Sequence, residues 1–77
     1  MEVEVLFFGQ LTDKTACARV FMPNPGTIGR LKKVLCEQYP SLRNAHFVMA
    51  LQNKIAQEDD CIGADATVAL MPPFSGG

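Results

Sequence analysis

The chain ends in the segment MPPFSGG, residues 71–77, and its chemistry is expected at the terminal carboxylate. Two glycines lack Cβ atoms, so the last peptide units can lie extended in a channel too narrow for side chains. The two prolines before them stiffen the segment and hold it away from a folded body. A carboxylate becomes electrophilic when ATP converts it into an acyl-adenylate, from which a sulfur or nitrogen nucleophile displaces AMP. The ending therefore fits a chain whose own terminus reacts, and a plain frayed glycine tail is the alternative.

The rest of the chain offers no second candidate for chemistry. We find no Ser-His pair, phosphate-cradling loop or coupled carboxylates. The only histidine, His46, has no cysteine at metal-ligand spacing, so we expect a surface histidine and no metal site. Cys17, Cys36 and Cys61 are odd in number and form no Cys-x-x-Cys motif, which fits a reducing compartment. We expect Cys17 and Cys36 to be packing residues and Cys61 to lie in a polar loop without a role in sulfur relay.

Length and composition indicate one small folded domain. The chain has 77 residues, of which 48% are hydrophobic and 19% charged, and these values are typical of a globule. The chain has seven basic and eight acidic residues, so its net charge is −1. This balance gives no electrostatic reason to expect nucleic acid or an anionic membrane as a partner. No apolar run approaches membrane-spanning length and no leader pattern precedes the domain. We therefore expect a cytoplasmic protein.

The elements that must carry the tail begin with two strands. Residues 2–8 alternate so that Val3, Val5 and Phe7 face a core and the residues between them face the other way. Gly9 ends this strand, residues 11–14 are expected to be a connection, and residues 15–21 a second strand in a hairpin with a longer loop. The pattern leaves open which face of that second strand is buried.

A helix follows the Pro-rich segment at residues 23–26. Thr27 is a plausible N-cap, and Pro40 ends the helix. Gly29 weakens the helix by about 1 kcal/mol relative to alanine, so this glycine is either tightly packed or suboptimal. Apolar residues recur at helical spacing at Ile28, Leu31, Val34, Leu35 and Tyr39.

The second half of the chain reads as three more strands. Residues 47–51 form one, residues 52–53 a tight turn into a short strand at 54–56, and residues 67–71 the last strand. The intervening residues 57–66 are polar and expected to be irregular. This order of elements predicts an α+β fold, a β-grasp with a mixed sheet over one main helix and the last strand at the centre. We expect the domain to span 1–71 and a flexible Gly-Gly tail to span 72–77.

Two segments carry a resemblance to a known family. Residues 5–10 (VLFFGQ) and 68–77 (VALMPPFSGG) resemble the opening strand and the closing strand with tail of the small subunit of molybdopterin synthase, a ubiquitin-like sulfur carrier. The resemblance covers essentially the whole chain. Gln52 stands where the family usually has Asn, and Asp65-Ala66 where it usually has Gly-Asp, which affects turn shape. Phe74 replaces a more usual Val or Ile in the tail.

The resemblance implies a mechanism. A ubiquitin-activating-like adenylyltransferase would use ATP to adenylate the carboxylate of Gly77, and sulfur transfer would convert it into a thiocarboxylate. The tail would then enter the large subunit of molybdopterin synthase, in a heterotetramer, and give its sulfur to the dithiolene of molybdopterin. In this interpretation the chain binds no cofactor and is a sulfur-donating subunit without a complete active site. Tail insertion would fall to Pro72, Pro73, Phe74, Ser75 and Gly76.

Docking of such a carrier requires an apolar patch on its surface. If Val68 and Leu70 face the core, then Met71 faces outward, as Phe8 does on the first strand. Ile55 is the apolar position that the resemblance assigns to the short fourth strand. We expect Phe8, Ile55 and Met71 to form the docking face together with the tail residue Phe74. The alternatives are a satellite cluster under the chain's own loops for Phe8 and Met71, and an ordinary core position for Ile55.

Three other functions remain open at this point. A sulfur carrier of another pathway, such as thiamine synthesis, shares the Gly-Gly end but tends to lack the Pro-Pro-x-Ser before it. A ubiquitin-like modifier uses the same activation to form isopeptide bonds with lysines. A passive β-grasp binding module would be indifferent to deletion of Gly76-Gly77.

Overall fold

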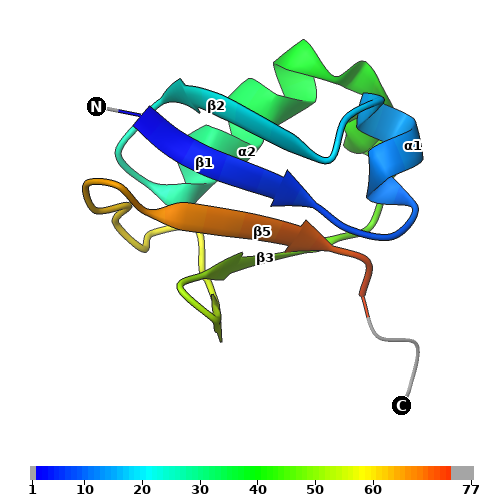
Figure 1. The fold of residues 1–77 in the computed structure, drawn as a ribbon. Helices are drawn as coiled ribbons and strands as arrows, with labels where there is room; N and C mark the ends of the chain where they lie inside the picture. The colour runs from blue at the N-terminus through cyan, green and yellow to red at the C-terminus, as the bar shows by residue number, and fades with distance from the viewer. Residues whose placement is uncertain (1, 74–77) are drawn as a thin grey trace.

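The structure is a computed structural model that describes residues 2–73. Strands and helices alternate in the first half of the chain, three strands follow one another in the second half, and the last strand runs directly toward the C-terminal segment (Figure 1). Our expectations for Phe74, Ser75, Gly76 and Gly77 lie outside the described residues. In chain order the elements are β1 (Glu2–Phe7), α1 (Leu11–Thr15), β2 (Arg19–Pro23), α2 (Ile28–Gln38), the 3-10 helix η1 (Pro40–Asn44), β3 (Val48–Leu51), β4 (Lys54–Ile55) and β5 (Thr67–Met71).

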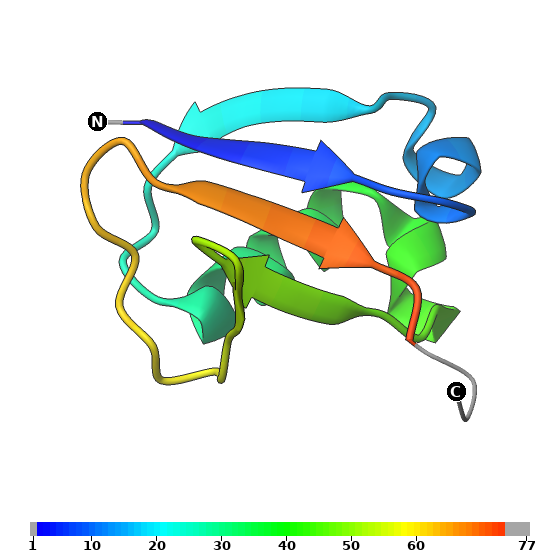
Figure 2. The same ribbon diagram turned by 60° about the horizontal axis from the view of Figure 1, so that its bottom comes forward.

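The five strands form one mixed sheet in the order β2-β1-β5-β3-β4. β1 and β5 pair in parallel, whereas β1 with β2, β3 with β5 and β3 with β4 pair antiparallel. The prediction that the last strand lies at the sheet centre is therefore confirmed (Figures 1 and 2). Because β5 is central, its backbone is held on both sides up to the point where the tail begins.

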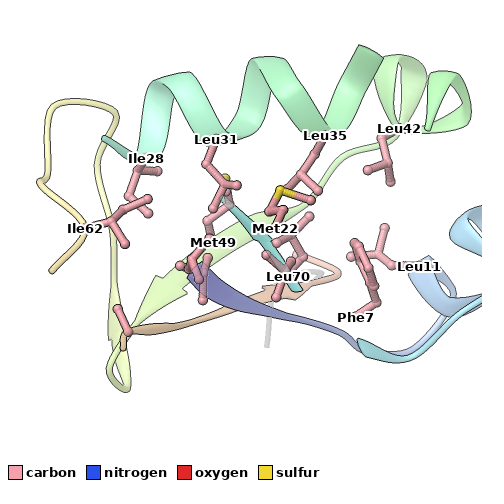
Figure 3. Close-up of a cluster of buried hydrophobic side chains, with 14 residues drawn as sticks. Phe7, Leu11, Met22, Ile28, Leu31, Leu35, Leu42, Met49, Ile62 and Leu70 are labelled. Carbon is pink, nitrogen blue, oxygen red and sulfur yellow. The ribbon is translucent and has the colours of Figure 1, made fainter. Parts of the chain in front are cut away.

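One face of the sheet is covered by α2, and the hydrophobic core lies between them (Figure 3). Val3, Val5 and Phe7 of β1 are buried, as the alternation predicts, and so are Val68 and Leu70 of β5. Complete burial of such a side chain stabilises the fold by about 1.5–3 kcal/mol. Val5 pairs with Val68 and Phe7 with Leu70, so residues from the two ends of the chain meet in the core. Their burial fixes the parallel β1–β5 register that positions the tail.

Helix α2 begins where the sequence predicts. The Thr27 side chain accepts a hydrogen bond from the Arg30 backbone N–H at 3.3 Å, which is the expected N-cap contact. Val34, although in the helical pattern, lies at the edge of the apolar stripe and is 37% exposed. Gly29 is tightly packed: its N–H donates to the Glu58 carbonyl at 2.8 Å, and a Cβ at Gly29 would lie 3.1 Å from that oxygen.

The prediction that residues 11–14 are an irregular connection is wrong, because these residues belong to the short helix α1. Leu11 and Thr15 are buried, and the Thr15 hydroxyl donates to the carbonyl oxygens of Leu11 and Cys17 at 3.0 and 2.9 Å. The second strand consequently starts at Arg19 rather than at residue 15. A five-residue helix buries only one i, i+4 pair, which is too short a repeat to detect by periodicity.

The sequence did not decide which face of the second strand is buried, and the later residues of that strand answer the question. Met22 is buried and Val20 half-buried against the core, whereas Phe21 between them is 54% exposed. The core therefore takes the set that includes Val20. Our pattern stopped at Phe21 and so missed Met22, the residue that identifies the buried face.

Two connections are more ordered than the sequence suggests. Pro40 ends α2 as predicted, but the chain continues as η1, whose Leu42 is buried. The polar segment 57–66 also contributes Ile62 and Ala66 to the core. The turn at Gln52 and Asn53 has positive φ at both residues, 52° and 70°, as a tight hairpin turn requires.

The cysteines are distributed as expected for packing residues. Cys17 and Cys36 are half-buried against the core, and Cys61 is exposed. The Cys17 sulfur lies 3.7 Å from the Tyr39 hydroxyl. Burial raises the pKa of Tyr39, and the neighbouring Cys17 raises it further. Tyr39 also packs edge-on against Phe7, with ring centroids 5.7 Å apart.

Candidate functional site: the tail exit and the open face

The tail leaves the domain from the end of the central strand. β5 ends at Met71, and Pro72 and Pro73 follow it as half-buried and exposed residues. The Phe8 N–H donates to the Leu70 carbonyl at 3.0 Å, so the pairing of β1 with β5 continues to the last residues of the strand. The exit is therefore fixed by the middle of the sheet and not by an edge strand (Figures 1 and 2).

The sheet face that α2 does not cover, which we call the open face, carries an apolar row across four strands. The register places Leu6 beside Ala69, Ala69 beside Ala50, and Ala50 beside Ile55. Leu6 and Ala69 are half-buried, and Ile55 is 63% exposed at the end of the row. Small alanines between larger side chains leave a shallow hollow in the sheet surface.

The structure brings the three described docking candidates to the rim of this hollow. Phe8 is 46% exposed, Ile55 is 63% exposed and Met71 is half-buried. The chain's own loops leave Phe8 exposed, and Ile55 is a surface residue and not a core residue. We call this region the apolar hollow; it is lined by Leu6, Phe8, Ala50, Gln52, Asn53, Ile55, Asp65, Thr67, Ala69 and Met71.

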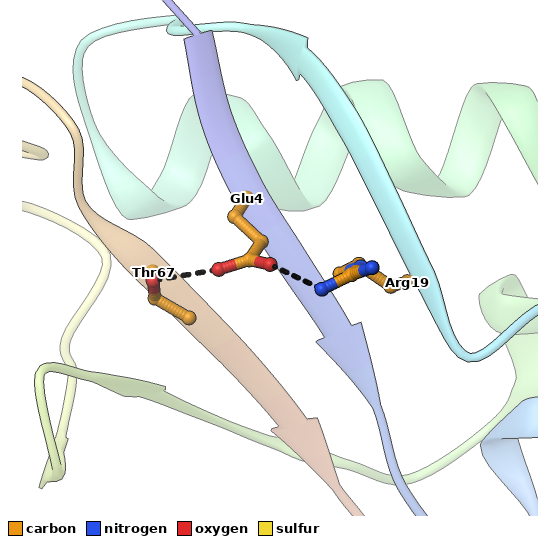
Figure 4. Close-up of polar contacts among 3 residues, drawn as sticks. All are labelled: Glu4, Arg19 and Thr67. Atoms are coloured by element: carbon orange, nitrogen blue, oxygen red, sulfur yellow. Dashed lines mark hydrogen bonds and ion pairs between the residues drawn. The ribbon is translucent and has the colours of Figure 1, made fainter.

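The open face also carries a polar cluster beside this hollow. A Glu4 carboxylate oxygen lies 3.3 Å from an Arg19 guanidinium nitrogen, and the other accepts a hydrogen bond from the Thr67 hydroxyl at 3.0 Å (Figure 4). The Arg19 guanidinium also lies 5.8 Å from the ring centroid of Phe21. Sequence reasoning missed this cluster, because Glu4, Arg19 and Thr67 meet only through the strand register. Because Arg19 pairs with Leu6 and Thr67 lines the hollow, this polar cluster directly adjoins the apolar hollow.

Residues 2–73 provide no separate catalytic constellation. Within them, no three His, Cys, Asp or Glu side chains are grouped so that they could hold a metal ion. The N–H groups of Ile28 and Gly29 at the start of α2 donate to the carbonyls of Asp60 and Glu58, so the chain itself occupies a position that could bind phosphate. No helix of the described part is long and apolar enough to cross a membrane. The apolar hollow lies beside the exit of the tail.

Comparison with known families assigns the chain to one family. The ThiS family matches residues 5–77, which is nearly the whole chain and includes the tail. The chain belongs to the ThiS family. This assignment confirms the resemblance to the ubiquitin-like sulfur carriers that the sequence suggests.

Solved structures resemble this ThiS-family chain over nearly all of its length. A candidate molybdopterin converting factor subunit 1 from Pyrococcus furiosus superposes with a TM-score of 0.90 at 12% identity, covering 96% of this chain and 99% of that one. Small archaeal modifier protein 1 of Haloferax volcanii gives 0.83 at 20% identity, covering 95% and 98%. A chain in a complex of subunits 1 and 2 of molybdopterin-converting factor from Helicobacter pylori gives 0.74 at 24% identity, covering all of both chains.

These similarities confirm the predicted β-grasp fold. At identities of 12–24% they establish the arrangement of the chain and not its individual role. The family and the fold together make this protein a ThiS-family chain of β-grasp architecture.

Proposed function

We propose that this protein is the sulfur carrier subunit of a molybdopterin synthase. The observation that carries the proposal is the juxtaposition of an apolar hollow, rimmed by Phe8, Ile55 and Met71, with the exit of a tail that ends in Gly76-Gly77. The family match extends through that tail. Two structural neighbours bear the name of molybdopterin converting factor, which favours this pathway over the thiamine-type carrier.

The reaction takes place at the carboxylate of Gly77. In the first step a carboxylate oxygen attacks the α-phosphorus of ATP, so that an acyl-adenylate forms and pyrophosphate leaves. In the second step hydrosulfide attacks the carbonyl carbon. The C–O bond to AMP breaks, AMP leaves, and a thiocarboxylate remains. Its sulfur is then available to the dithiolene of molybdopterin.

The described residues contribute binding and orientation. The apolar hollow would be covered by the partner, and burial of its exposed side chains supplies affinity in the way that a hydrophobic interface core does. The prolines after Met71 carry the terminus away from that interface, and a tail ending in two glycines enters a channel that would exclude larger side chains. In this proposal the catalytic groups belong to the partners.

Two partners follow from this function. An adenylyltransferase of the ubiquitin-activating type uses ATP to activate Gly77. A molybdopterin synthase large subunit accepts the charged carrier, and the neighbour from Helicobacter pylori is itself a complex of subunits 1 and 2 of molybdopterin-converting factor. We propose the same kind of pairing here, with two carriers flanking a dimer of large subunits and with the complex in the cytoplasm.

A ubiquitin-like modifier is the second candidate, and the small archaeal modifier proteins among the neighbours favour it. In that case the nucleophile that displaces AMP is a lysine amine of a target protein, and an isopeptide bond results. The two functions share the activation step and differ in the acceptor. Peptides in which a target lysine carries the Gly-Gly remnant would identify this second use.

The deciding experiment is the intact mass of the protein after incubation with the adenylyltransferase of its host, MgATP and sulfide. We expect replacement of one oxygen by one sulfur in the full chain and no change in a Gly77-deleted control. Transfer of that sulfur to a cyclic pterin precursor with the large subunit would then identify the molybdopterin pathway. An unmodified mass, with the enzyme active on a known carrier, would contradict the proposal.

A further inference from the structure

The turn after β1 lies directly against the root of the tail. Gly9 has φ of +59°, and a Cβ built on it would lie 2.8 Å from Cγ and 3.3 Å from Cδ of Pro72. Real carbon atoms do not approach to 2.8 Å without displacement, since their optimal separation is about 3.5–4.0 Å. The pyrrolidine ring of Pro72 therefore occupies space that exists because residue 9 is glycine.

Gly9 is itself held in place from two directions. Its carbonyl accepts hydrogen bonds from the Thr12 hydroxyl at 2.8 Å and the Thr12 N–H at 3.2 Å. The first residue of α1, Leu11, is buried in the core and anchors the helix. On the other side the Phe8 N–H donates to Leu70 of β5 at 3.0 Å. The surface that Pro72 contacts is thus a rigid part of the domain.

Pro72 transmits this position to the segment that follows it. Its ring fixes its own φ near about −65°, so contact between the ring and Gly9 restricts the direction in which the chain leaves β5. We propose that Gly9 is a positioning residue for the reaction at Gly77: the absence of a side chain at residue 9 seats Pro72 and directs the tail relative to the apolar hollow. The functional part of this inference rests on the proposed sulfur-carrier function.

Direction matters because a docked carrier must deliver its carboxylate to a distant site. With the domain bound through the hollow, the reacting atom is placed only by the segment after Met71. A misplacement of about 1 Å can slow a reaction by about 100-fold, since reacting groups must be held in near-attack geometry. A change at Gly9 would therefore slow turnover without altering the docking side chains.

The test is a double-mutant cycle of Gly9→Ala and Pro72→Ala, read as ATP-dependent sulfur incorporation with the host adenylyltransferase and sulfide. We expect Gly9→Ala to lower kcat by roughly 10- to 100-fold when residue 72 is proline, because the added methyl group overlaps the Pro72 ring. The same substitution should cost less than about threefold when residue 72 is alanine. KM for the carrier should change little in either background, because the apolar hollow is intact.

Gly26→Ala is the matched control. Gly26 also has positive φ, +105°, but a Cβ there would have no atom within 4 Å. An alanine at φ +105° is more strained than one at +59°, because +105° lies outside the left-handed region that L residues adopt, but it does not touch the tail root, and we expect wild-type kcat from this variant. Thr12→Val, which removes the hydroxyl donor to the Gly9 carbonyl and leaves the glycine in place, replaces Gly9→Ala if that variant does not fold, and should lower kcat several-fold.

Nuclear Overhauser effects between the Gly9 α protons and the Pro72 ring protons test the geometry without any reaction. Their presence in the wild type, together with coupled costs in the cycle, supports the role. Their absence overturns it, as does an equal cost of Gly9→Ala in both backgrounds of a reactive protein. A wild-type chain that acquires no sulfur overturns the proposed function and this role together, so the two failures are distinguishable.

Discussion

The two faces of the sheet carry apolar side chains for different reasons. On the covered face Val3, Val5, Val68 and Leu70 are fully buried under α2. On the open face Phe8 and Ile55 are 46% and 63% exposed, and no element of residues 2–73 covers them. Exposure of such side chains forgoes about 1.5–3 kcal/mol of burial for each. Folding accounts for the first set, and the docking that we propose would account for the second.

In strand β5, two adjacent residues lie on opposite faces of the sheet. Leu70 faces the core and Met71 faces the open side, because successive side chains of a strand point to opposite faces. Both residues are large hydrophobes, a branched leucine and a flexible methionine, at the end of the same central strand. Substitutions at the two positions therefore compare the faces with little change in backbone context.

The largest expected effect is on the covered face. Leu70→Ala removes a fully buried side chain and leaves a cavity, which should lower the free energy of unfolding by about 2–5 kcal/mol. Met71→Ala should lower it by much less, since Met71 keeps part of its surface in water. Urea denaturation followed by circular dichroism measures both. Equal losses at the two positions would mean that the faces do not differ in the way described.

The next effect is on binding through the open face. Met71→Asp places a charge at the rim of the apolar hollow, and we expect affinity for the large subunit to fall by at least about 30-fold, the loss typical of an interface hot spot. Isothermal titration calorimetry with the large subunit measures the change. The free energy of unfolding should stay within about 1 kcal/mol of wild type, because the aspartate is solvated.

Val34→Asp is the control for this substitution. Val34 is also a partly exposed hydrophobe, 37% exposed, but it lies on α2 at the far side of the sheet. A comparable loss of affinity from Val34→Asp would show that any added charge weakens binding. Unfolding of the Met71→Asp variant would assign Met71 to the core and contradict the docking role.

The same contrast explains how much could be predicted from sequence. Alternation in β1 and β5 predicted the covered face because burial repeats every second residue, and Thr27 and Pro40 gave the limits of α2. The helices α1 and η1 were missed because five residues are too few to establish a helical period. Such short elements form because tertiary contacts bury single residues, Leu11 and Leu42, within them.

The candidate site was predictable in its members and not in its arrangement. Phe8, Ile55 and Met71 could be chosen from alternation and resemblance, but their common rim depends on which strands are neighbours. The contact of Gly9 with Pro72 has no signal in a single sequence, because it joins loops near opposite ends of the chain through the parallel pairing of β1 and β5. Local residue types show the periodicity of a single strand, but they do not show the pairing register between strands that are distant in the sequence.

The smallest expected effect lies in the polar cluster beside the apolar hollow and marks the edge of the docking region. Arg19→Ala removes the ion pair with Glu4, but the Arg19 side chain is 62% exposed, so the pair contributes about 0–1 kcal/mol to stability. Glu4 keeps its hydrogen bond from Thr67, which leaves no orphaned polar group. Because β1 separates Arg19 from the strand that carries the tail, affinity for the large subunit should change by less than about threefold. A loss as large as that of Met71→Asp, measured in the same titration, would extend the interface across the entire open face and end the division of that face into two regions.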